Sequence, residues 1–160
     1  MGSRSKIEEF AYIAGFLDGD GSIMLQIKHR NDSKRGWRFM FTICFYQDTR
    51  HEKPLFWIQQ KLGIGYISRR NDGITELRIN GYKQSARVLK ALLPYIKFKK
   101  IQAVAILKAA HILSGKNFDL LKNKEKFLLR DILLRIQAEN YQSRAKKSSL
   151  ELTKILGLTP

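Results

Sequence analysis

The sequence predicts an α+β fold: an αββαββα core with a four-stranded antiparallel sheet, followed by extra C-terminal helices. Two observations predict it. Apolar residues recur at helical spacing in some segments and at every second position in others, and the two patterns follow one another in that order. The 160 residues suit one compact domain. We expect a single domain over 1–160, with the core at about 7–113 and C-terminal helices at about 118–156.

The first half of the core is predicted to be a helix and a hairpin. Helical spacing runs from Ile7 to Leu17, and Asp18-Gly19-Asp20-Gly21 is expected to break the helix. Ser22 to Lys28 alternates apolar and polar residues, as a strand with one buried face does. A polar loop from Arg30 to Gly36 leads into a second alternating strand, Phe39 to Phe45.

The second half of the core is predicted to contain a short helix, a second pair of strands and further helices. Pro54 fits the first turn of a helix from Leu55 to Leu62, which Gly63 ends. Strands are expected at 64–70 and 74–80, joined by an Asp-Gly turn. The remaining helices are expected at 82–93, 101–113, 124–137 and 150–156, with a Lys/Ser-rich loop or frayed end up to Lys147 before the last of them.

Charge gives the first indication of function. The chain has 30 Lys and Arg residues against 14 Asp and Glu residues, so its net charge is +16. Hydrophobic residues make up 44%, enough for a real core. A small domain this basic repels itself, and a polyanionic partner offsets that repulsion, so we expect nucleic acid. The alternative is a structural basic protein of the ribosomal type.

Several classes of protein are disfavoured by composition. Cys44 is the only cysteine, which precludes an internal disulfide and fits a reducing compartment. The three histidines, His29, His51 and His111, have no zinc-binding spacing. No apolar run approaches the ~20 residues of a membrane span. We expect a soluble intracellular protein of an organelle or a microbial cytoplasm, with no membrane partner and no small-molecule substrate.

The segment from Ile13 to Gly21 carries the chemistry. Ala11, Gly15 and Gly19 are four residues apart, so they line one helical face with almost no side chain and allow a second helix to approach closely. Asp20 is expected just past the helix C-terminus, where the helix dipole disfavours a negative charge and a divalent cation would compensate it. The plainer alternative is that Asp18 and Asp20 only terminate the helix in an Asp-Gly turn.

This segment, Ile13-Ala14-Gly15-Phe16-Leu17-Asp18-Gly19-Asp20-Gly21, resembles the LAGLIDADG motif. Five of its nine positions match outright, apolar residues occupy three more, and Gly19 replaces alanine. The chain resembles the single-motif, homodimeric branch of the LAGLIDADG homing endonucleases, the algal chloroplast intron-encoded type. The similarity runs from about Phe10 to Gln102, and the motif does not recur in the second half.

The resemblance implies that the four-stranded antiparallel sheet is saddle-shaped. It also implies a site-specific DNA endonuclease that cuts both strands of a long pseudo-palindromic site as a homodimer, in intron homing. It implies Asp20 as metal ligand with the carbonyl of Gly19, and Gln47 and Lys99 as further catalytic residues. Mg²⁺ is the expected metal, Mn²⁺ is expected to substitute, and Ca²⁺ is expected to support binding without cleavage. Without the family, Gln47 is a strand-end polar residue and Lys99 one member of a basic run.

One position departs from the branch, and one surface is expected to hold the dimer together. An arginine that the branch carries shortly after the glutamine falls at His51, and Arg50 or Lys53 is the candidate substitute. Two copies are expected to meet through the first helix. The expected interface residues are Ala11, Gly15, Asp18 and Gly19.

Strand alternation separates a core face from a DNA-reading face. The core-facing residues are expected to be Ile23, Leu25, Ile27, Phe39, Phe41, Ile43, Phe45, Ile67, Leu77 and Ile79. The opposite face mixes Arg, Lys, Gln, Asn, Thr and Met, which suit base edges in the major groove. Its members are Ser22, Met24, Gln26, Lys28, Arg30, Arg38, Met40, Thr42, Cys44, Tyr46, Tyr66, Ser68, Arg70, Glu76, Arg78 and Asn80. A merely solvated face is the alternative.

A second function stays open within the same resemblance. A protein derived from these endonucleases can serve as an RNA maturase, or bind DNA without cutting it. The presence of Asp20 favours cleavage but does not decide against a maturase.

Overall fold

A computed structural model describes residues 3–140 and 146–159 of the chain. Part of the Lys/Ser-rich stretch expected as a loop, residues 141–145, lies outside these described residues. The helices and strands, in chain order, are α1 (Ser3–Asp20), β1 (Gly21–His29), β2 (Trp37–Asp48), the 3₁₀ turn η1 (Thr49–His51), α2 (Lys53–Leu62), β3 (Tyr66–Arg69), β4 (Ile74–Asn80), α3 (Tyr82–Leu92), α4 (Lys100–Gly115), the 3₁₀ turn η2 (Phe118–Leu120), α5 (Asn123–Glu139) and α6 (Ser149–Ile155).

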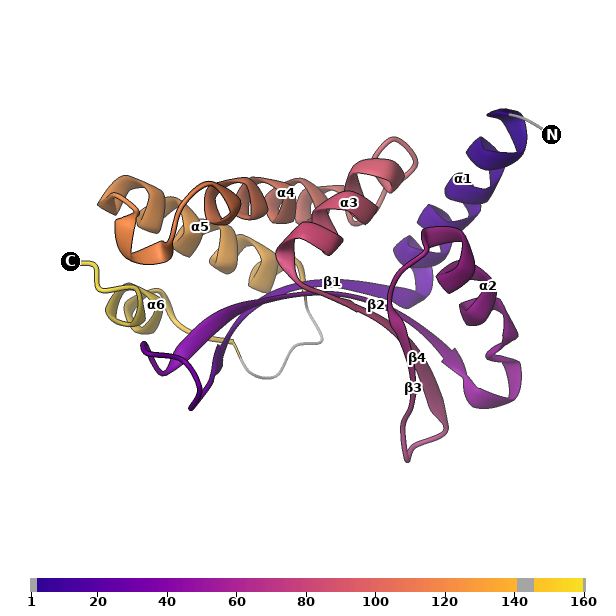
Figure 1. Cartoon of the computed structure of the whole chain (residues 1–160), viewed down its shortest axis with the longest axis horizontal. Coiled ribbons are helices and arrows are strands. Elements are labelled where there is room, and N and C mark those ends of the chain that lie inside the picture. Colours follow the sequence, from indigo (N-terminus) through magenta and orange to yellow (C-terminus); the bar gives the residue numbers. More distant parts are fainter. Residues whose placement is uncertain (1–2, 141–145, 160) are drawn as a thin grey trace.

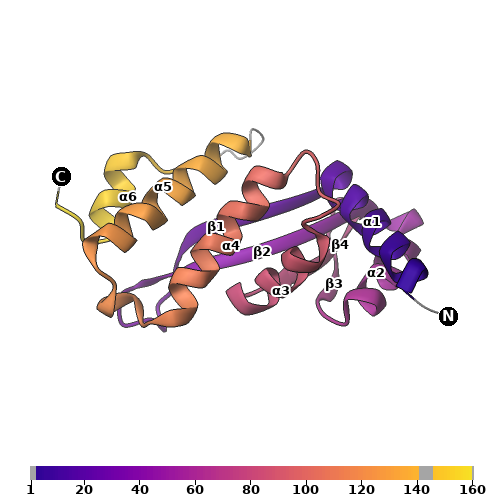
Figure 2. The same cartoon turned by 90° about the horizontal axis from the view of Figure 1, so that it is seen from above.

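The four strands form one antiparallel sheet in the order β1-β2-β4-β3. The register places Ser22, Cys44, Arg78 and Tyr66 in one row across all four strands. Figure 1 shows the sheet arched, with α3, α4 and α5 over its convex side and its concave side largely uncovered by helices. Seen from above, α4 and α5 run along the length of the sheet (Figure 2). The predicted α+β fold is therefore confirmed.

The core lies between the convex side of the sheet and the helices. Alternate strand residues point into it, and Ile23, Ile43 and Leu77 are fully buried there. Burying a side chain of this size contributes about 1.5–3 kcal/mol. Phe39 and Ile67, which the alternation predicted as core-facing, are only partly buried. Phe39 lies in the outer part of the hairpin, and Ile67 lies on the edge strand β3.

The first helix is longer than predicted. The Asp18-Gly19-Asp20-Gly21 segment was expected to break it, but α1 continues to Asp20, and neither of the two glycines adopts a positive φ. The chain then enters β1 at Gly21, where a Cβ would lie 2.6 Å from Leu17 Cδ1 and 2.9 Å from the Cys44 carbonyl oxygen. Only glycine permits this close passage between helix and sheet. Asp20 is thus the last residue of the helix and not a residue beyond it.

Local signals placed the other boundaries within a few residues. Gly63 caps α2 in the left-handed conformation, with φ 63° and ψ 27°, and Pro54 lies in the first turn of that helix. The strand β4 has the predicted bounds, whereas β3 is shorter than predicted. Among the described residues, no helix combines the length and the apolar character that crossing a membrane requires.

Candidate functional site

Asp20 ends α1 with its side chain exposed at the start of the sheet. No hydrogen bond or ion pair holds its carboxylate within the described part of the chain. The last carbonyls of a helix have no partner in the helix itself, so the Gly19 carbonyl adds a second oxygen donor beside the carboxylate. A hard divalent cation prefers this kind of donor set.

Asp18 has a different place from the predicted one. It was expected at the dimer interface, but it is only 8% exposed, and its carboxylate accepts hydrogen bonds from three backbone amides of its own chain. These are Lys97 N at 2.6 Å, Phe98 N at 3.2 Å and Lys99 N at 3.0 Å. The amides approach the N-terminus of α4, where a negative charge is favoured. Asp18 therefore anchors α4 to the end of α1 within one subunit.

Asp18→Ala is expected to destabilise the protein by about 2–3 kcal/mol, because buried amides lose a charged acceptor. For a domain of this size the melting temperature should fall by roughly 4–12 °C. Thermal unfolding followed by circular dichroism measures this. Asp32→Ala is the matched control, since Asp32 is exposed and pairs only with nearby Arg30. Equal melting temperatures for both variants would contradict the anchoring role.

The anchoring of α4 brings Lys99 to the motif. The Lys99 ammonium donates to the Asp18 carbonyl oxygen. Burial lowers the pKa of Lys99, while the carboxylates of Asp18 and Asp20 oppose that shift. A partly desolvated ammonium beside Asp20 is therefore available to an incoming anion.

Gln47 approaches the same place from the end of β2. Its Oε1 accepts a hydrogen bond from Asp48 N at 2.8 Å, so the side-chain NH₂ is the group left to donate outward. One cavity of about 1380 Å³ is lined by Gly19, Asp20, Gln47 and Lys99 together. The structure thus gathers the four predicted metal and catalytic residues, although they are up to 80 positions apart in sequence.

A single subunit provides too few ligands for a complete metal centre. Among residues 3–140 and 146–159, no group of three or more His, Cys, Asp and Glu side chains is placed to hold a metal ion. Asp20 and Gly19 fit as one half of an oxygen-donor site for a divalent cation. The other half must come from outside the subunit, from a second copy, from the substrate or from water.

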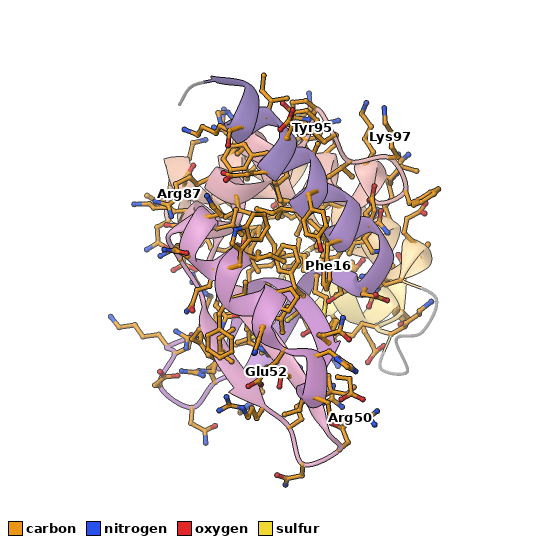
Figure 3. All side chains as sticks on the ribbon, turned by 90° about the vertical axis from the view of Figure 1, so that its right-hand side faces the viewer. Phe16, Arg50, Glu52, Arg87, Tyr95 and Lys97 are labelled. Atoms are coloured by element: carbon orange, nitrogen blue, oxygen red, sulfur yellow. The ribbon has the colours of Figure 1, made fainter. Side chains whose placement is uncertain are left out.

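The proposed substitutes for the missing arginine, Arg50 and Lys53, are not among the residues that line the cavity of Asp20. The Arg50 guanidinium is 2.7 Å from the Asp48 carboxylate, which also receives the Arg50 backbone amide. These hydrogen bonds hold the pKa of Asp48 well below its usual range. His51 is exposed in η1, and Lys53 is exposed at the start of α2. Figure 3 shows Arg50 at the lower end of the face formed by α1 and α2, with Glu52 close by.

The predicted DNA face divides into two parts of different charge. At the outer end of the β1–β2 hairpin, Lys28 and Arg38 lie opposite each other and are both exposed. No carboxylate pairs with either of them among the described residues. Two unneutralised cations side by side suit phosphate groups.

Nearer the centre of the face, the charges are paired. Glu76 is only 5% exposed, and its carboxylate binds Arg78 at 2.7 Å and Arg70 at 3.3 Å. Arg70 also binds Asp72 at 2.5 Å. Guanidinium groups held in place by carboxylates are less suited to neutralising phosphates than to presenting a fixed fork of donors to a base edge.

Three residues predicted to read DNA are instead buried. Thr42, Cys44 and Glu76 are 3%, 0% and 5% exposed. Their positions on the strands are as expected, but longer neighbours cover them, and burial raises the pKa of the Cys44 thiol. Thr42 donates to the Asn80 side chain at 3.0 Å. These three residues therefore support the face and do not line it.

A hydrogen-bonded pair of side chains lies next to the motif, between β1 and β2. The Ser22 hydroxyl and the Tyr46 phenol oxygen are 3.0 Å apart across β1 and β2. Burial is the main cause that raises the pKa of Tyr46 to about 12, so the phenol keeps its proton at neutral pH. Tyr46 therefore offers a fixed hydrogen-bonding group beside the cavity of Asp20.

The face of α1 that points away from its own subunit is unusually bare. A Cβ at Gly15 or Gly19 would meet nothing within 4 Å, and neither residue has a positive φ. No contact or backbone conformation within the subunit therefore requires glycine at positions 15 and 19. Figure 3 looks onto this side, where α1 crosses the front of the molecule with Tyr95 and Lys97 beside it. Tyr12, on this helix, is 55% exposed, and Phe98, whose amide contacts Asp18 near the end of the helix, is 83% exposed.

Phe98 was missed by sequence reasoning. It lies within the basic run that was weighed for Lys99 alone, and its amide contact with Asp18 places it at the end of α1. The sequence signal that could have identified Phe98 is a phenylalanine inside a run of lysines. Large apolar side chains this exposed, beside a helix face without side chains, indicate a surface that another chain covers.

Comparison with known proteins decides the family. The family model for LAGLIDADG endonuclease matches residues 13–127, most of the chain. The chain belongs to the LAGLIDADG endonuclease family. Its motif residues are those of α1 described above, from Ile13 at the buried side of the helix to Gly21 at the entry of the sheet.

Two curated LAGLIDADG relatives come from green algae. The chain is 36% identical over 99 residues to the DNA endonuclease I-CvuI of Chlorella vulgaris, covering 62% of each protein. It is 32% identical over 108 residues to the DNA endonuclease I-CreI of Chlamydomonas reinhardtii, covering 68% of this chain and 66% of the relative. The aligned segments thus span slightly less than two thirds of these relatives.

Solved structures extend the likeness to nearly the whole chain. A crystal structure of I-CvuI in complex with the I-CreI target superposes with a TM-score of 0.77 and 28% identity, covering 99% of this chain and 100% of that one. The archaeal intron-encoded homing endonuclease I-Vdi141I, complexed with DNA, superposes with a TM-score of 0.80 at 21% identity. The latter supports the LAGLIDADG fold alone.

Proposed function

We propose that this protein is a site-specific endonuclease that binds double-stranded DNA as a homodimer and cuts both strands with Mg²⁺. One observation carries the proposal: Asp20, Gln47 and Lys99 line a single cavity, which extends from the motif along β1. Membership in the LAGLIDADG endonuclease family supports the same reaction. We further propose that residues 1–160 act as one domain, because a single core cluster extends from α1 to Leu158.

Dimerisation would complete the active site. If the bare face of α1 packs against the same face of a second copy, two-fold symmetry brings the two Asp20 carboxylates to one end of the paired helices. Like charges held close together are costly unless cations neutralise them. Each subunit would then supply half of the ligands, which fits the lack, among the described residues of one copy, of a group of three His, Cys, Asp or Glu side chains placed to hold a metal ion.

The chain's own residues have separate tasks in the proposed reaction. Asp20 and the Gly19 carbonyl would hold Mg²⁺, which when bound activates water and stabilises the charge of the leaving group. Lys99 would place its ammonium beside the scissile phosphate, while Asp18 fixes the backbone from which Lys99 extends. Gln47 would donate its side-chain NH₂ to the attacking water or to a phosphate oxygen.

The sheet sets the length of the target. The nine residues of β1, at ~3.3 Å each, follow DNA for about eight or nine base pairs of ~3.4 Å. Two subunits would therefore read a long pseudo-palindromic site, with the cut near its centre, where the α1 helices end. The exposed members of the predicted face would contact bases, and Lys28 and Arg38 would contact phosphates at its outer ends.

Cleavage of a randomised duplex library tests this function. In Mg²⁺ the protein should cut both strands at one family of related sites and leave a stagger. In Ca²⁺ it should retain the same sites without cutting. A protein that selects duplex DNA in both metals but cuts in neither would be a DNA-binding protein only, and selection of structured RNA would indicate the maturase alternative. Mn²⁺ is expected to substitute for Mg²⁺.

The place of action is proposed on simpler grounds. Cys44 is buried and reduced, and the substrate is genomic DNA, so we place the protein in the compartment of that DNA. This is an organelle or a microbial cytoplasm. Fractionation of cells that express the natural gene would locate it.

A further inference from the structure

The outer half of the β1–β2 hairpin has no third strand beside it. β4 pairs with β2 only from Thr42 to Asp48, whereas β1 and β2 pair from Gly21 to His29. From Thr42 toward the turn of the hairpin, β1 and β2 therefore form a two-stranded ribbon. An isolated two-stranded ribbon is marginally stable in water. This outer ribbon carries Gln26, Lys28, Arg38 and Met40, so its position decides what these side chains can reach.

Arg35 joins the tip of this ribbon to the C-terminal half of the chain. Its guanidinium binds the Asp119 carboxylate at 2.8 Å and the Asn117 side-chain oxygen at 3.4 Å. The same group lies 5.0 Å from the ring centroid of Phe118 and 5.5 Å from that of Trp37. It is thus held by η2 through charge, hydrogen bonding and ring contact together.

The aromatic residues under Arg35 form the rest of this contact. Trp37 and Phe118 pack edge to face with centroids 5.0 Å apart, and Phe39 lies 5.8 Å from Phe118. Phe118 is buried, with 7% exposure, so the ribbon rests on a side chain that belongs to the core. Lys34, the neighbouring cation, is exposed and makes no such contact among the described residues.

We propose that Arg35 is a positioning residue for DNA specificity: it clamps the outer ribbon to η2 and thereby fixes which bases the ribbon reads, without itself contacting DNA. The proposal rests on the proposed function, since it assigns a role within the same DNA face. It also gives the C-terminal segment a task in recognition, because η2 supplies the surface on which the ribbon rests.

Three variants separate a clamp from a phosphate contact. Arg35→Ala and Lys34→Ala remove the same charge from neighbouring positions, but only the first removes the clamp. Asp119→Ala removes one partner of Arg35 while raising the net charge. If Arg35 acted only through its charge, the two cation variants would behave alike, and Asp119→Ala would leave selectivity intact or tighten binding. A clamp predicts that Arg35→Ala and Asp119→Ala behave alike instead.

Two measurements distinguish a clamp from a phosphate contact. In the free protein, hydrogen exchange of residues 28–38 should become about five- to tenfold faster in Arg35→Ala and Asp119→Ala, and remain unchanged in Lys34→Ala. In selections from a randomised duplex library in Ca²⁺, base preference should weaken about five- to tenfold at the outer positions of each half-site, with the centre unchanged. Arg35→Lys should show most of the loss, since a lysine lacks the planar fork.

Two outcomes would overturn the clamp. Unchanged exchange in Arg35→Ala and Asp119→Ala would show that the ribbon does not depend on Arg35. Equal loss of selectivity in Arg35→Ala and Lys34→Ala would make Arg35 a charge contact with DNA. A wild-type protein that enriches no site would contradict the proposed endonuclease function, while exchange in the free protein still reports on the clamp.

Discussion

Asp20→Asn is expected to abolish DNA cleavage in Mg²⁺ while leaving a folded dimer that binds its site as tightly as before or more tightly. The carboxylate lies at a helix C-terminus, where its charge is unfavourable, and no hydrogen bond or ion pair among the described residues holds it. Asparagine keeps the shape and loses the charge that attracts the cation. The cleavage rate should fall roughly 10³-fold or more, because Asp18 and Asp48, which line the same cavity, are already held by backbone amides and by Arg50.

Single-turnover cleavage on a preferred site measures this loss, and binding in Ca²⁺ with thermal unfolding checks that the variant is intact. Asp131→Asn removes the same charge from an exposed residue on α5, paired with Arg130, and should cut normally. Undiminished cutting by Asp20→Asn would remove Asp20 from the mechanism. An unfolded variant would support the plainer reading that Asp20 only shapes the helix end.

Local sequence patterns were sufficient to predict most of the fold. Alternation identified the core face of every strand, and Gly63 and Asp72-Gly73 marked their turns correctly. The end of α1 was mistaken, because two glycines and two aspartates weaken a helix locally. Tertiary contacts override that tendency here: Asp18 is held by the amides before α4, about 80 residues away, and no local pattern reports such a partner.

The sequence predicted where the site residues lie better than which of them are exposed, and their catalytic and metal-binding roles stay predictions. The resemblance brought Asp20, Gln47 and Lys99 together, and the structure places them in one cavity. Strand alternation identified the DNA side but not which members of it are covered. Thr42, Cys44 and Glu76 lie beneath longer neighbours, which depends on how side chains from adjacent strands pair. The role proposed for Arg35 depends likewise on a contact 84 residues away.

Gly15→Leu is expected to prevent dimerisation without unfolding the subunit. A side chain at this position meets nothing within 4 Å in its own chain, and the backbone is helical, so the folded subunit can accept it. A second α1 packed against the bare face could not. Forcing extra atoms into a close contact costs about 1–3 kcal/mol, and two-fold symmetry introduces the change twice. The dimer should weaken roughly 30- to 10⁴-fold, and cleavage should be lost with it.

Gly115→Leu is the matched control, because Gly115 is also a helical glycine whose Cβ would meet nothing within 4 Å, and it lies at the end of α4, away from the bare face of α1. Sedimentation velocity at micromolar concentration should show a dimer for the wild type and Gly115→Leu, and a folded monomer for Gly15→Leu. A Gly15→Leu protein that sediments as an unchanged dimer would place the interface elsewhere. The exposed Phe98 then becomes the next surface to test, since its 83% exposure also calls for a partner.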